Sequence, residues 1–442
     1  MLRLHDTATA TVRPLELREP GKVSMYVCGP TVYDVPHLGH GRFVLVFDVL
    51  RRYLSWRGFD VRYVSNITDV DDKIISRAGD EGRTEAEVAT QYEAVWNQAI
   101  DALGVARPDE VPHATDFVER MVVLVAELVD AGVAYTTAEG VYLAVDEVPG
   151  YGRLARQSLD SLRAGARVEV DDDKRSPLDF ALWKRAKPGE PSWASPWGPG
   201  RPGWHTECVV MALDLLGDGF DVHGGGADLA FPHHENERAQ AVALGRGFAR
   251  HWVHNGWVVV EGEKMSKSLA NFTSLTDLLA RVDSRAYRLL VLRSHYRSPL
   301  EVTPASTADA AAALERLDNL ARRSAEVGLA EVAPDPEALA RFVDAMDDDL
   351  DTPAAMALLF DLNRRANVAL DAGDLDAAAP VVAALRELAG AVGLALASGD
   401  GSLDAETSAL VERRDRARQA RDWPAADAAR QELVARGWVV ED

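Results

Sequence analysis

The sequence predicts an α/β fold: a Rossmann-like domain whose parallel sheet is split by a connective insertion, followed by a helical bundle and a small C-terminal domain. Three observations support this prediction. A strand, a glycine-containing turn, a helix and a second strand follow one another between residues 22 and 64. Strand-like segments return after residue 220, beyond a segment of mixed character. From residue 307 onward the chain is rich in Ala, Leu, Arg and Asp, with long helical patterns. A βαβ order that resumes later in the chain favours one parallel sheet.

The first predicted strand covers residues 22–27 and ends in the turn-forming run Cys28-Gly29-Pro30. Cys28 is therefore expected at the carboxyl end of a strand. Residues 42–57 carry apolar side chains at helical spacing and stop at Gly58. A second strand, residues 60–64, leads into the polar segment 66–73. Ligands bind at the carboxyl edge of open parallel sheets, so these polar residues are candidates for a site.

The rest of the chain divides into a second α/β part and a helical part. Residues 84–135 are predicted to be helical, and residues 136–200 form a mixed insertion. Residues 220–222 and 257–260 are expected to resume the sheet. In the helical part, Asp351-Thr352-Pro353 fits a helix start, since proline is tolerated in the first turn. The segment 397–402 is predicted to be a linker to a small C-terminal unit.

Composition excludes several classes of protein. The 442 residues are 47% apolar and 27% charged, which is typical of a globular chain and not of a disordered one. The N-terminus has no apolar leader, and no stretch approaches the 18 or more apolar residues of a membrane span. We therefore expect a cytoplasmic protein with no membrane partner. The net charge of −22 disfavours indiscriminate binding to nucleic acid, so an RNA partner would need local basic patches.

Two short motifs combine glycine or small residues with basic side chains. His37-Leu38-Gly39-His40 places two imidazoles at the entrance to a helix, where backbone N–H groups favour phosphate. Two surface histidines at a turn are the alternative. Residues 264–268 contain Lys264 and Lys267, two of only seven lysines, with two serines. Such a segment suits a leaving polyphosphate, although a solvated loop remains possible.

A third group suggests a metal site. The chain has two cysteines, Cys28 and Cys208, which excludes a disulfide framework and leaves an isolated thiol, a single bridge or metal ligation open. His233 and Glu237 are four residues apart, so they lie on one face if they share a helix. Two thiols, an imidazole and a carboxylate form a reasonable zinc site, provided that the fold brings them together. A buried structural cysteine is the commoner role for either thiol taken alone.

These segments together resemble the class I aminoacyl-tRNA synthetases, with the HIGH motif at residues 37–40 and the KMSKS motif at residues 264–268. A narrower resemblance is to the cysteinyl-tRNA synthetase family. It is carried, in order and across nearly the whole chain, by residues 25–34, 66–73, 173–175, 203–208 and 223–237. Two departures are Ala270, where the family commonly has glycine, and the end of the chain at Asp442, where many relatives continue. The first is expected to stiffen the closure of the loop, and the second to remove anticodon contacts and so to affect tRNA binding more than adenylation.

The resemblance implies ATP-dependent activation of L-cysteine to cysteinyl-adenylate and transfer to the 3′ end of tRNA(Cys). ATP is a substrate and is accompanied by Mg²⁺. The resemblance also implies one Zn²⁺ per subunit, which selects the substrate thiolate because sulfur is a softer ligand than the hydroxyl of serine. The implied zinc ligands are Cys28, Cys208, His233 and Glu237.

The same resemblance assigns the remaining site residues. The catalytic residues are His37 and His40, which stabilise the α-phosphate, and Lys264 and Lys267, which hold the departing pyrophosphate. Residues that bind ATP are Gly39, His40, Lys264 and Lys267. The cysteine pocket is assigned to Thr31, Trp204, His223 and Asp228. Contacts to the tRNA anticodon are assigned to Arg418, Trp423, Asp427 and Asp442, in a basic segment with an aromatic side chain.

The implied domain order is a Rossmann-like catalytic domain, a helical bundle and a C-terminal anticodon-binding domain. The expected boundaries are 1–120 for the first half of the catalytic domain, 121–200 for the connective insertion, 201–260 for the second half with the zinc site, 261–306 for the KMSKS loop and stem-contact region, 307–396 for the bundle and 403–442 for the anticodon-binding domain. We expect a monomer. The alternative is a mycothiol-pathway ligase that gives cysteine to an amino-sugar inositol. A non-catalytic tRNA-binding paralogue is disfavoured because both motifs are intact.

Overall fold

The computed structural model describes residues 1–156, 174–260, 263–264, 273–397, 405–420 and 422–435. The chain divides into two compact units. The first comprises residues 1–317 and 330–395, and the second comprises residues 318–329 and 396–442. The predicted linker at 397–402 falls outside the described residues except for Ala397. Among the described residues, no helix is both long and apolar enough to cross a membrane.

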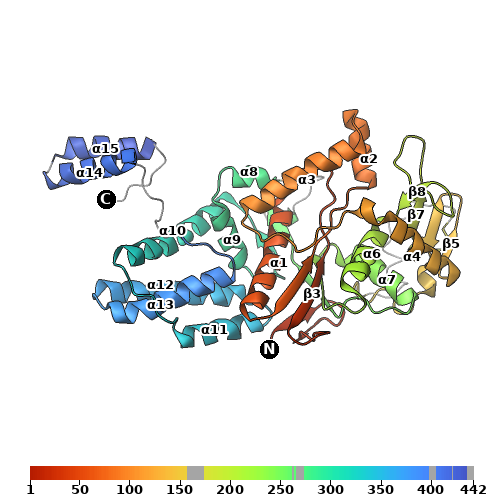
Figure 1. The fold of residues 1–442 in the computed structure, drawn as a ribbon, viewed down its shortest axis with the longest axis horizontal. Coiled ribbons are helices and arrows are strands. Elements are labelled where there is room, and N and C mark those ends of the chain that lie inside the picture. Colours follow the sequence, from red (N-terminus) through yellow and green to blue (C-terminus); the bar gives the residue numbers. More distant parts are fainter. Residues whose placement is uncertain (157–173, 261–262, 265–272, 398–404, 421, 436–442) are drawn as a thin grey trace. The chain divides into compact units, whose positions relative to one another are not determined.

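A four-stranded parallel sheet forms the centre of the first unit, with strand order β10-β9-β3-β4. Its strands are β3 (Lys22–Val27), β4 (Asp60–Val64), β9 (Val222–Gly226) and β10 (His251–Asn255). The helix α1 (Leu38–Trp56) contacts β4 and β9, and α6 (Trp204–Leu216) contacts β3 from the other side (Figure 1). This arrangement confirms the predicted α/β fold with a split parallel sheet.

Two glycines allow the backbone to pack closely in this sheet. A Cβ on Gly224 would lie 2.3 Å from the ring of Phe47, so glycine lets α1 pack against β9. A Cβ on Gly29 would lie 1.6 Å from the carbonyl oxygen of Asn66, which brings the segment after β3 against the segment after β4. Glycine is therefore required at both positions for steric reasons.

Helices and a second sheet fill the interval between β4 and α6. The helices are α2 (Asp72–Glu81), α3 (Glu85–Ala102) and α4 (Val118–Asp130). The predicted mixed insertion contains an antiparallel sheet of β5 (Ala134–Thr136), β6 (Gly140–Leu143), β7 (Phe180–Arg185) and β8 (Gly200–Pro202). Trp183 of β7 is completely buried in the core that this insertion shares with α6.

One sequence prediction about the later strands was wrong, and one strand was missed. Residues 257–260 were expected to resume the catalytic sheet, but β11 (Val258–Val260) lies in a separate sheet with β12 (Glu263–Lys264) and β13 (Leu300–Glu301). The edge of the catalytic sheet is instead β10, whose five residues are all buried. Its two histidines are tolerated there because both are hydrogen-bonded: His251 Nε2 faces the Leu4 carbonyl at 3.0 Å and His254 Nδ1 faces Thr7 Oγ1 at 2.7 Å. A short antiparallel pair, β1 (Arg3–Asp6) and β2 (Thr11–Pro14), lies nearby.

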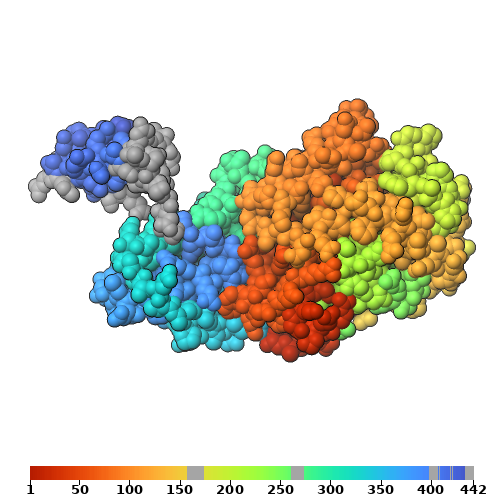
Figure 2. Space-filling model, in the orientation of Figure 1, coloured from red at the N-terminus to blue at the C-terminus, as the bar shows by residue number. Residues whose placement is uncertain are grey.

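The remaining described helices lie after β9, and those from residue 304 onward were predicted from the helical patterns there. They are α7 (Glu235–Ala243), α8 (Leu275–Leu279), α9 (Ser284–Leu292), α10 (Pro304–Glu326), α11 (Pro336–Asp347), α12 (Thr352–Asp371), α13 (Leu375–Ala391), α14 (Ala405–Gln419) and α15 (Trp423–Ala435). The predicted start at Asp351 is confirmed, because its carboxylate accepts a hydrogen bond from the Ala354 N–H at 3.0 Å. On the face shown in Figure 2, α11 to α13 pack against the N-terminal part of the chain, and α13 contacts α1.

A buried ion pair joins the helices α1 and α9. Asp48 of α1 is fully buried and pairs with Arg288 at 2.6 Å and with Arg52 at 2.9 Å. Arg288 also donates hydrogen bonds to the carbonyl oxygens of Leu103, Gly104 and Val392. The arrangement connects α1 to three other segments, and the buried Asp48 and Arg288 each have an oppositely charged partner.

Candidate active site and metal centre

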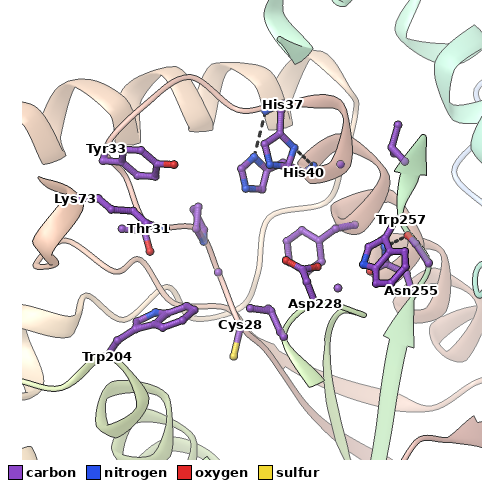
Figure 3. A pocket seen from close by; sticks show the side chains of 18 residues that line it. Cys28, Thr31, Tyr33, His37, His40, Lys73, Trp204, Asp228, Asn255 and Trp257 are labelled. Carbon is purple, nitrogen blue, oxygen red and sulfur yellow. Dashed lines mark hydrogen bonds between the residues drawn. The ribbon is translucent and has the colours of Figure 1, made fainter. Parts of the chain in front are cut away.

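A cavity with a volume of about 360 Å³ opens at the carboxyl ends of β3, β9 and β10. This is the edge of a parallel sheet where ligands are expected. Figure 3 shows the side chains that line it. They come from the segment after β3, the start of α1, the first turns of α2 and α6, and the segments after β9 and β10. The predicted residues Cys28, Thr31, His37, Gly39, His40, Trp204 and Asp228 are all among them.

The two histidines of the HIGH motif form a reciprocal cap on α1. His37 Nδ1 accepts a hydrogen bond from the His40 N–H, and His40 Nδ1 accepts one from the His37 N–H, both at 3.2 Å. The two rings stack with their centroids 3.7 Å apart. A Cβ on Gly39 would lie 2.9 Å from the His37 ring, so glycine makes room for the stack. Both imidazoles therefore stand at the positive end of the helix, where a phosphate is favoured.

The backbone connects the KMSKS segment to the HIGH segment. Lys264 lies on β12 and pairs with Val259 of β11, directly after the cavity residues Trp257 and Val258. Beyond the motif, the Leu275 N–H donates to the Pro36 carbonyl at 2.8 Å. Lys267 lies outside the described residues, so its predicted role stays a prediction. The described residues just before the motif therefore lie next to the cavity, and those after it contact the segment that precedes α1.

The four predicted metal ligands converge beneath the cavity. Cys28 follows β3, Cys208 lies in α6, His233 lies in the π-helical turn Ala230–His234, and Glu237 lies in α7. One ligand atom from each lies within 4.8 Å of the others, and all four residues are buried. The two thiols are not joined in a disulfide. The structure thus brings together residues that are up to 209 positions apart in the chain.

Hydrogen bonds orient two of these ligands. Glu237 Oε2 faces His223 Nε2 at 2.6 Å, whereas Glu237 Oε1 faces His233 Nε2 at 3.0 Å and Cys28 Sγ at 3.4 Å. The other ring nitrogen of His233 faces His205 Nδ1 at 2.9 Å. Glu237 and His233 therefore each direct one donor atom toward the centre of the group, and a histidine outside the group contacts the other donor atom, as is usual for metal ligands.

The electrostatics of the group favour deprotonated ligands. Burial alone would raise the pKa of the Glu237 carboxyl, but the charges of His223 and His233 hold it well below its usual range. A hydrogen bond with Cys28 lowers the pKa of the Cys208 thiol to about 6, whereas burial raises that of Cys28 well above its ordinary value. A carboxylate and a thiolate are the forms that bind a metal ion, so the donor set fits a soft divalent cation.

A second group of donors overlaps the first. It consists of Cys28, His223, His234 and Glu237, which meet the same 4.8 Å limit. In that group, the two ring nitrogens of His223 already face the Tyr26 carbonyl and Glu237. The first group offers a second thiol, and Trp204 at the cavity wall stacks on its His233 with ring centroids 4.0 Å apart. The first group is therefore the one that contacts a further residue of the cavity wall, Trp204, besides the shared Cys28.

The structure separates the four residues predicted for the cysteine pocket. Thr31, Trp204 and Asp228 line the cavity, but His223 does not. His223 is fully buried and contacts Glu237 Oε2, so its link is to the four-donor group and not to the cavity. Several lining residues were not assigned by the sequence analysis, among them Tyr33, Lys73, Asn255 and Trp257. Tyr33 and Lys73 belong to segments that carried the resemblance, while Asn255 is the last residue of the unpredicted strand β10 and Trp257 follows it.

The C-terminal unit contains the helical hairpin of α14 and α15, in which Arg413 pairs with Glu432 at 2.6 Å. Arg418, Trp423 and Asp427 are exposed on it, with Trp423 58% exposed. Asp442 lies outside the described residues. An exposed tryptophan beside arginines suits stacking on an unpaired base.

Comparison with known proteins agrees with this geometry. A model of the class I (C) tRNA synthetase catalytic domain matches residues 14–312, a DALR domain matches residues 341–397, and a cysteinyl-tRNA ligase anticodon binding domain matches residues 400–442. The cysteine–tRNA ligases of Halorhodospira halophila and Alkalilimnicola ehrlichii are 47% and 49% identical to the chain, over all of it and 98% of each relative. The chain belongs to the cysteine–tRNA ligase family.

Solved structures support the same assignment at the level of the fold. Mycobacterium tuberculosis methionyl-tRNA synthetase in complex with methionyl-adenylate has a TM-score of 0.62 and 17% identity, covering 84% of this chain and 89% of that one. The family membership and the matched anticodon binding domain favour the ligase prediction over the mycothiol-pathway alternative. The matched ranges differ in detail from the predicted domain boundaries, which stay predictions.

Proposed function

We propose that the chain activates L-cysteine with ATP to form cysteinyl-adenylate and transfers the cysteinyl group to the 3′ end of tRNA(Cys). The observation that supports this most strongly is the position of a four-donor group, Cys28, Cys208, His233 and Glu237, beneath the cavity that the HIGH motif also lines. One cavity would then hold an amino acid by its sulfur and a nucleotide by its phosphates.

The proposed ion is zinc, bound by these four side chains. When bound, it supplies a soft Lewis acid that prefers a substrate thiolate to a hydroxyl. The chain's own side chains do the rest of the selection: Trp204 and Thr31 limit the size of the pocket, and Asp228 offers a carboxylate to the substrate ammonium group. In an apolar pocket, the binding free energies of cysteine and serine would differ by only about 1–3 kcal/mol, so a site built only from such contacts would exclude serine poorly.

The proposed role of the HIGH and KMSKS residues is to stabilise charge on the phosphates. His37 and His40 stand where a phosphate would meet the N-terminus of α1, and they would stabilise the α-phosphate as the substrate carboxylate attacks it. Gly39 allows close approach of the phosphate to the backbone. Lys264 and Lys267 would hold the leaving pyrophosphate with its Mg²⁺. No side-chain nucleophile is needed, because the carboxylate of cysteine is the attacking group.

The proposed role of the C-terminal unit is to recognise the anticodon. Arg418, Trp423 and Asp427 are exposed on its helices, and Asp442 completes the predicted set. Trp423 would stack on an unpaired base, and Arg418 would meet a phosphate. We further propose that the protein acts as a monomer in the cytoplasm.

Cysteine-dependent exchange of pyrophosphate into ATP tests the first step. We expect exchange with cysteine and little with serine, together with about one zinc per chain. Cys208→Ser and Lys267→Ala should both reduce exchange strongly. Lys22→Ala is the matched control for the lysine, because Lys22 is exposed, pairs with Glu19 and lies at the opposite end of β3 from the cavity. A Lys267→Ala protein with undiminished exchange would exclude the leaving-group role.

The acceptor is tested with labelled cysteine and either tRNA or the amino-sugar inositol. Label on the tRNA supports the proposal. Label on the sugar alone would replace it with the mycothiol-pathway activity, and exchange with serine as fast as with cysteine would contradict the role of the metal.

A further inference from the structure

Lys73 is the one lysine or arginine among the described residues that line the cavity. Lysine is scarce in this chain, with seven residues against 41 arginines. The Lys73 Nζ lies 5.2 Å from the centroid of the Tyr33 ring, and both side chains line the same wall. The roles proposed above for the HIGH, KMSKS and metal-binding residues use neither of them.

The carboxylates next to Lys73 in the sequence are engaged elsewhere. Asp71 caps α2 by accepting a hydrogen bond from the backbone N–H of Lys73 at 2.9 Å. Asp72 pairs with Lys184 of β7 and Arg201 of β8. These pairs fix the first turn of α2 against the inserted sheet, and they leave the ammonium group of Lys73 directed to Tyr33 and the cavity (Figure 3).

Different walls of the cavity are assigned to different reactants. Figure 3 shows Asn255 and Trp257 on one side, continuous with the strand that leads to the KMSKS motif, and His37 and His40 above. The proposed nucleotide phosphates belong there. Cys28, which belongs to the four-donor group, and Trp204 lie at the bottom of the cavity in this view. The wall with Tyr33 and Lys73 lies opposite Asn255 and Trp257, and neither the nucleotide nor the amino acid has been assigned to it.

The third reactant is a strand of RNA. Its terminal nucleotide carries a phosphodiester and a base, and a protein usually holds such an end with a cation and an aromatic ring. We propose that Lys73 and Tyr33 form the binding site for the 3′-terminal nucleotide of the RNA acceptor, with Lys73 Nζ on a phosphodiester oxygen and the Tyr33 ring stacked on the base. This inference rests on the proposed function, since it names the place of the acceptor in that same site.

The surroundings of Lys73 suit an RNA strand on its way into the cavity. Two exposed basic residues, Arg185 and Lys187, lie on or just after β7, close in sequence to the Lys184 that pairs with Asp72, whereas Arg201 of β8 is buried and pairs with both Asp72 and Glu190. A chain with a net charge of −22 needs such a local concentration of positive charge to accept a polyanion.

The test compares the two half-reactions in Lys73→Gln. Pyrophosphate exchange reports adenylate formation without RNA, and single-turnover transfer from preformed cysteinyl-adenylate to tRNA reports the second step. We expect the ratio of transfer to exchange, at subsaturating tRNA, to fall about tenfold, as for the loss of one good contact. The log–log dependence of transfer on salt should lose about 0.7 of its slope, since one phosphate on a single strand is no longer neutralised.

Three further variants separate the chemistry from the fold. Lys73→Arg should restore most of the transfer, and Tyr33→Phe should keep it, whereas Tyr33→Leu should lower the ratio of transfer to exchange. Lys22→Gln is the matched control for the lysine and should leave both half-reactions as they are. Exchange itself reports whether each variant is folded.

The outcomes distinguish this inference from the proposed function. If Lys73→Gln lowers exchange as much as transfer, the ammonium group serves the nucleotide and the inference is wrong. If the variant changes neither step, Lys73 has no part in acceptor binding. If the unmodified protein shows no cysteine-dependent exchange, the proposed function fails before the acceptor is added.

Discussion

Replacing His223 by phenylalanine separates the orientation of Glu237 from the packing around it. The His223 ring is fully buried and packs near Tyr26 and Trp252, with ring centroids 5.5 Å and 4.9 Å away. Phenylalanine keeps a ring of similar size there. It removes the 2.6 Å hydrogen bond to Glu237 Oε2, which turns Oε1 toward the Cys28 and His233 donors.

The expected magnitude follows from the environment of that carboxylate. A hydrogen bond to a charged group is worth about 1.5–3 kcal/mol, and Glu237 is fully buried, so water does not replace the lost donor. Loss of a partner that orients a metal ligand usually weakens metal binding by about 10–100-fold. That range corresponds to about 1.4–2.7 kcal/mol, in agreement with the value for the hydrogen bond.

Competition with a chromophoric chelator measures the zinc affinity, and cysteine-dependent exchange is followed in parallel. His251→Phe is the matched control: His251 is also a buried histidine of the catalytic sheet, but its Nε2 faces the Leu4 carbonyl and not a metal ligand. We expect zinc to be released more readily from His223→Phe alone. An unchanged zinc affinity in His223→Phe would show that Glu237 does not depend on this partner, and the proposed ligand geometry would have to be abandoned.

Three other predictions concern stability and the C-terminal unit. Asp48→Asn leaves the buried Arg288 without its counter-charge and should lower the free energy of unfolding, measured in urea, by about 3–5 kcal/mol. Asp309→Asn, in an exposed pair, should lower it by less than about 1 kcal/mol, and equal losses would contradict this reasoning. Burial lowers the pKa of His254 to about 3, so between pH 7 and pH 5 this histidine takes up a proton in the unfolded chain but not in the folded one. Through this group, acidification should cost about 2 kcal/mol of folding stability, and the loss measured by unfolding at both pH values should be smaller in His254→Gln. Trp423→Ala should lower tRNA charging more than exchange, and an equal loss of both would make the C-terminal unit structural.

The sequence predicts those parts of the site that depend on local pattern. Cys28 lies just past the end of its strand because the apolar run and the turn cluster are contiguous. The HIGH histidines were expected at a helix entrance for the same reason, although α1 begins at Leu38, earlier than the apolar spacing alone indicated. The strand β10 was missed because His251 and His254 make the segment look exposed, and only their distant hydrogen-bond partners allow it to be buried.

What the sequence could not provide is the arrangement of distant segments. The convergence of Cys208 and Glu237 depends on how α6 and α7 pack, and spacing along the chain carries no information about it. The place of His223 behind the carboxylate, and of Lys73 beside Tyr33, follows from the same packing. The family resemblance supplied the ligand set before the structure placed its members together.

Gly224 has a consequence for the spacing between the two halves of the reaction. Its carbonyl accepts a hydrogen bond from the N–H of Cys28, one of the proposed metal ligands, at 3.2 Å, and its lack of a side chain leaves room for Phe47 on α1, the helix that begins at the HIGH motif. Gly224 therefore helps to set the distance between the proposed sites for the substrate sulfur and for the phosphate. A methyl group added at this position would collide with Phe47 and displace α1 from β9. Cysteine and ATP could then still bind, but the carboxylate and the α-phosphate would lie too far apart to react.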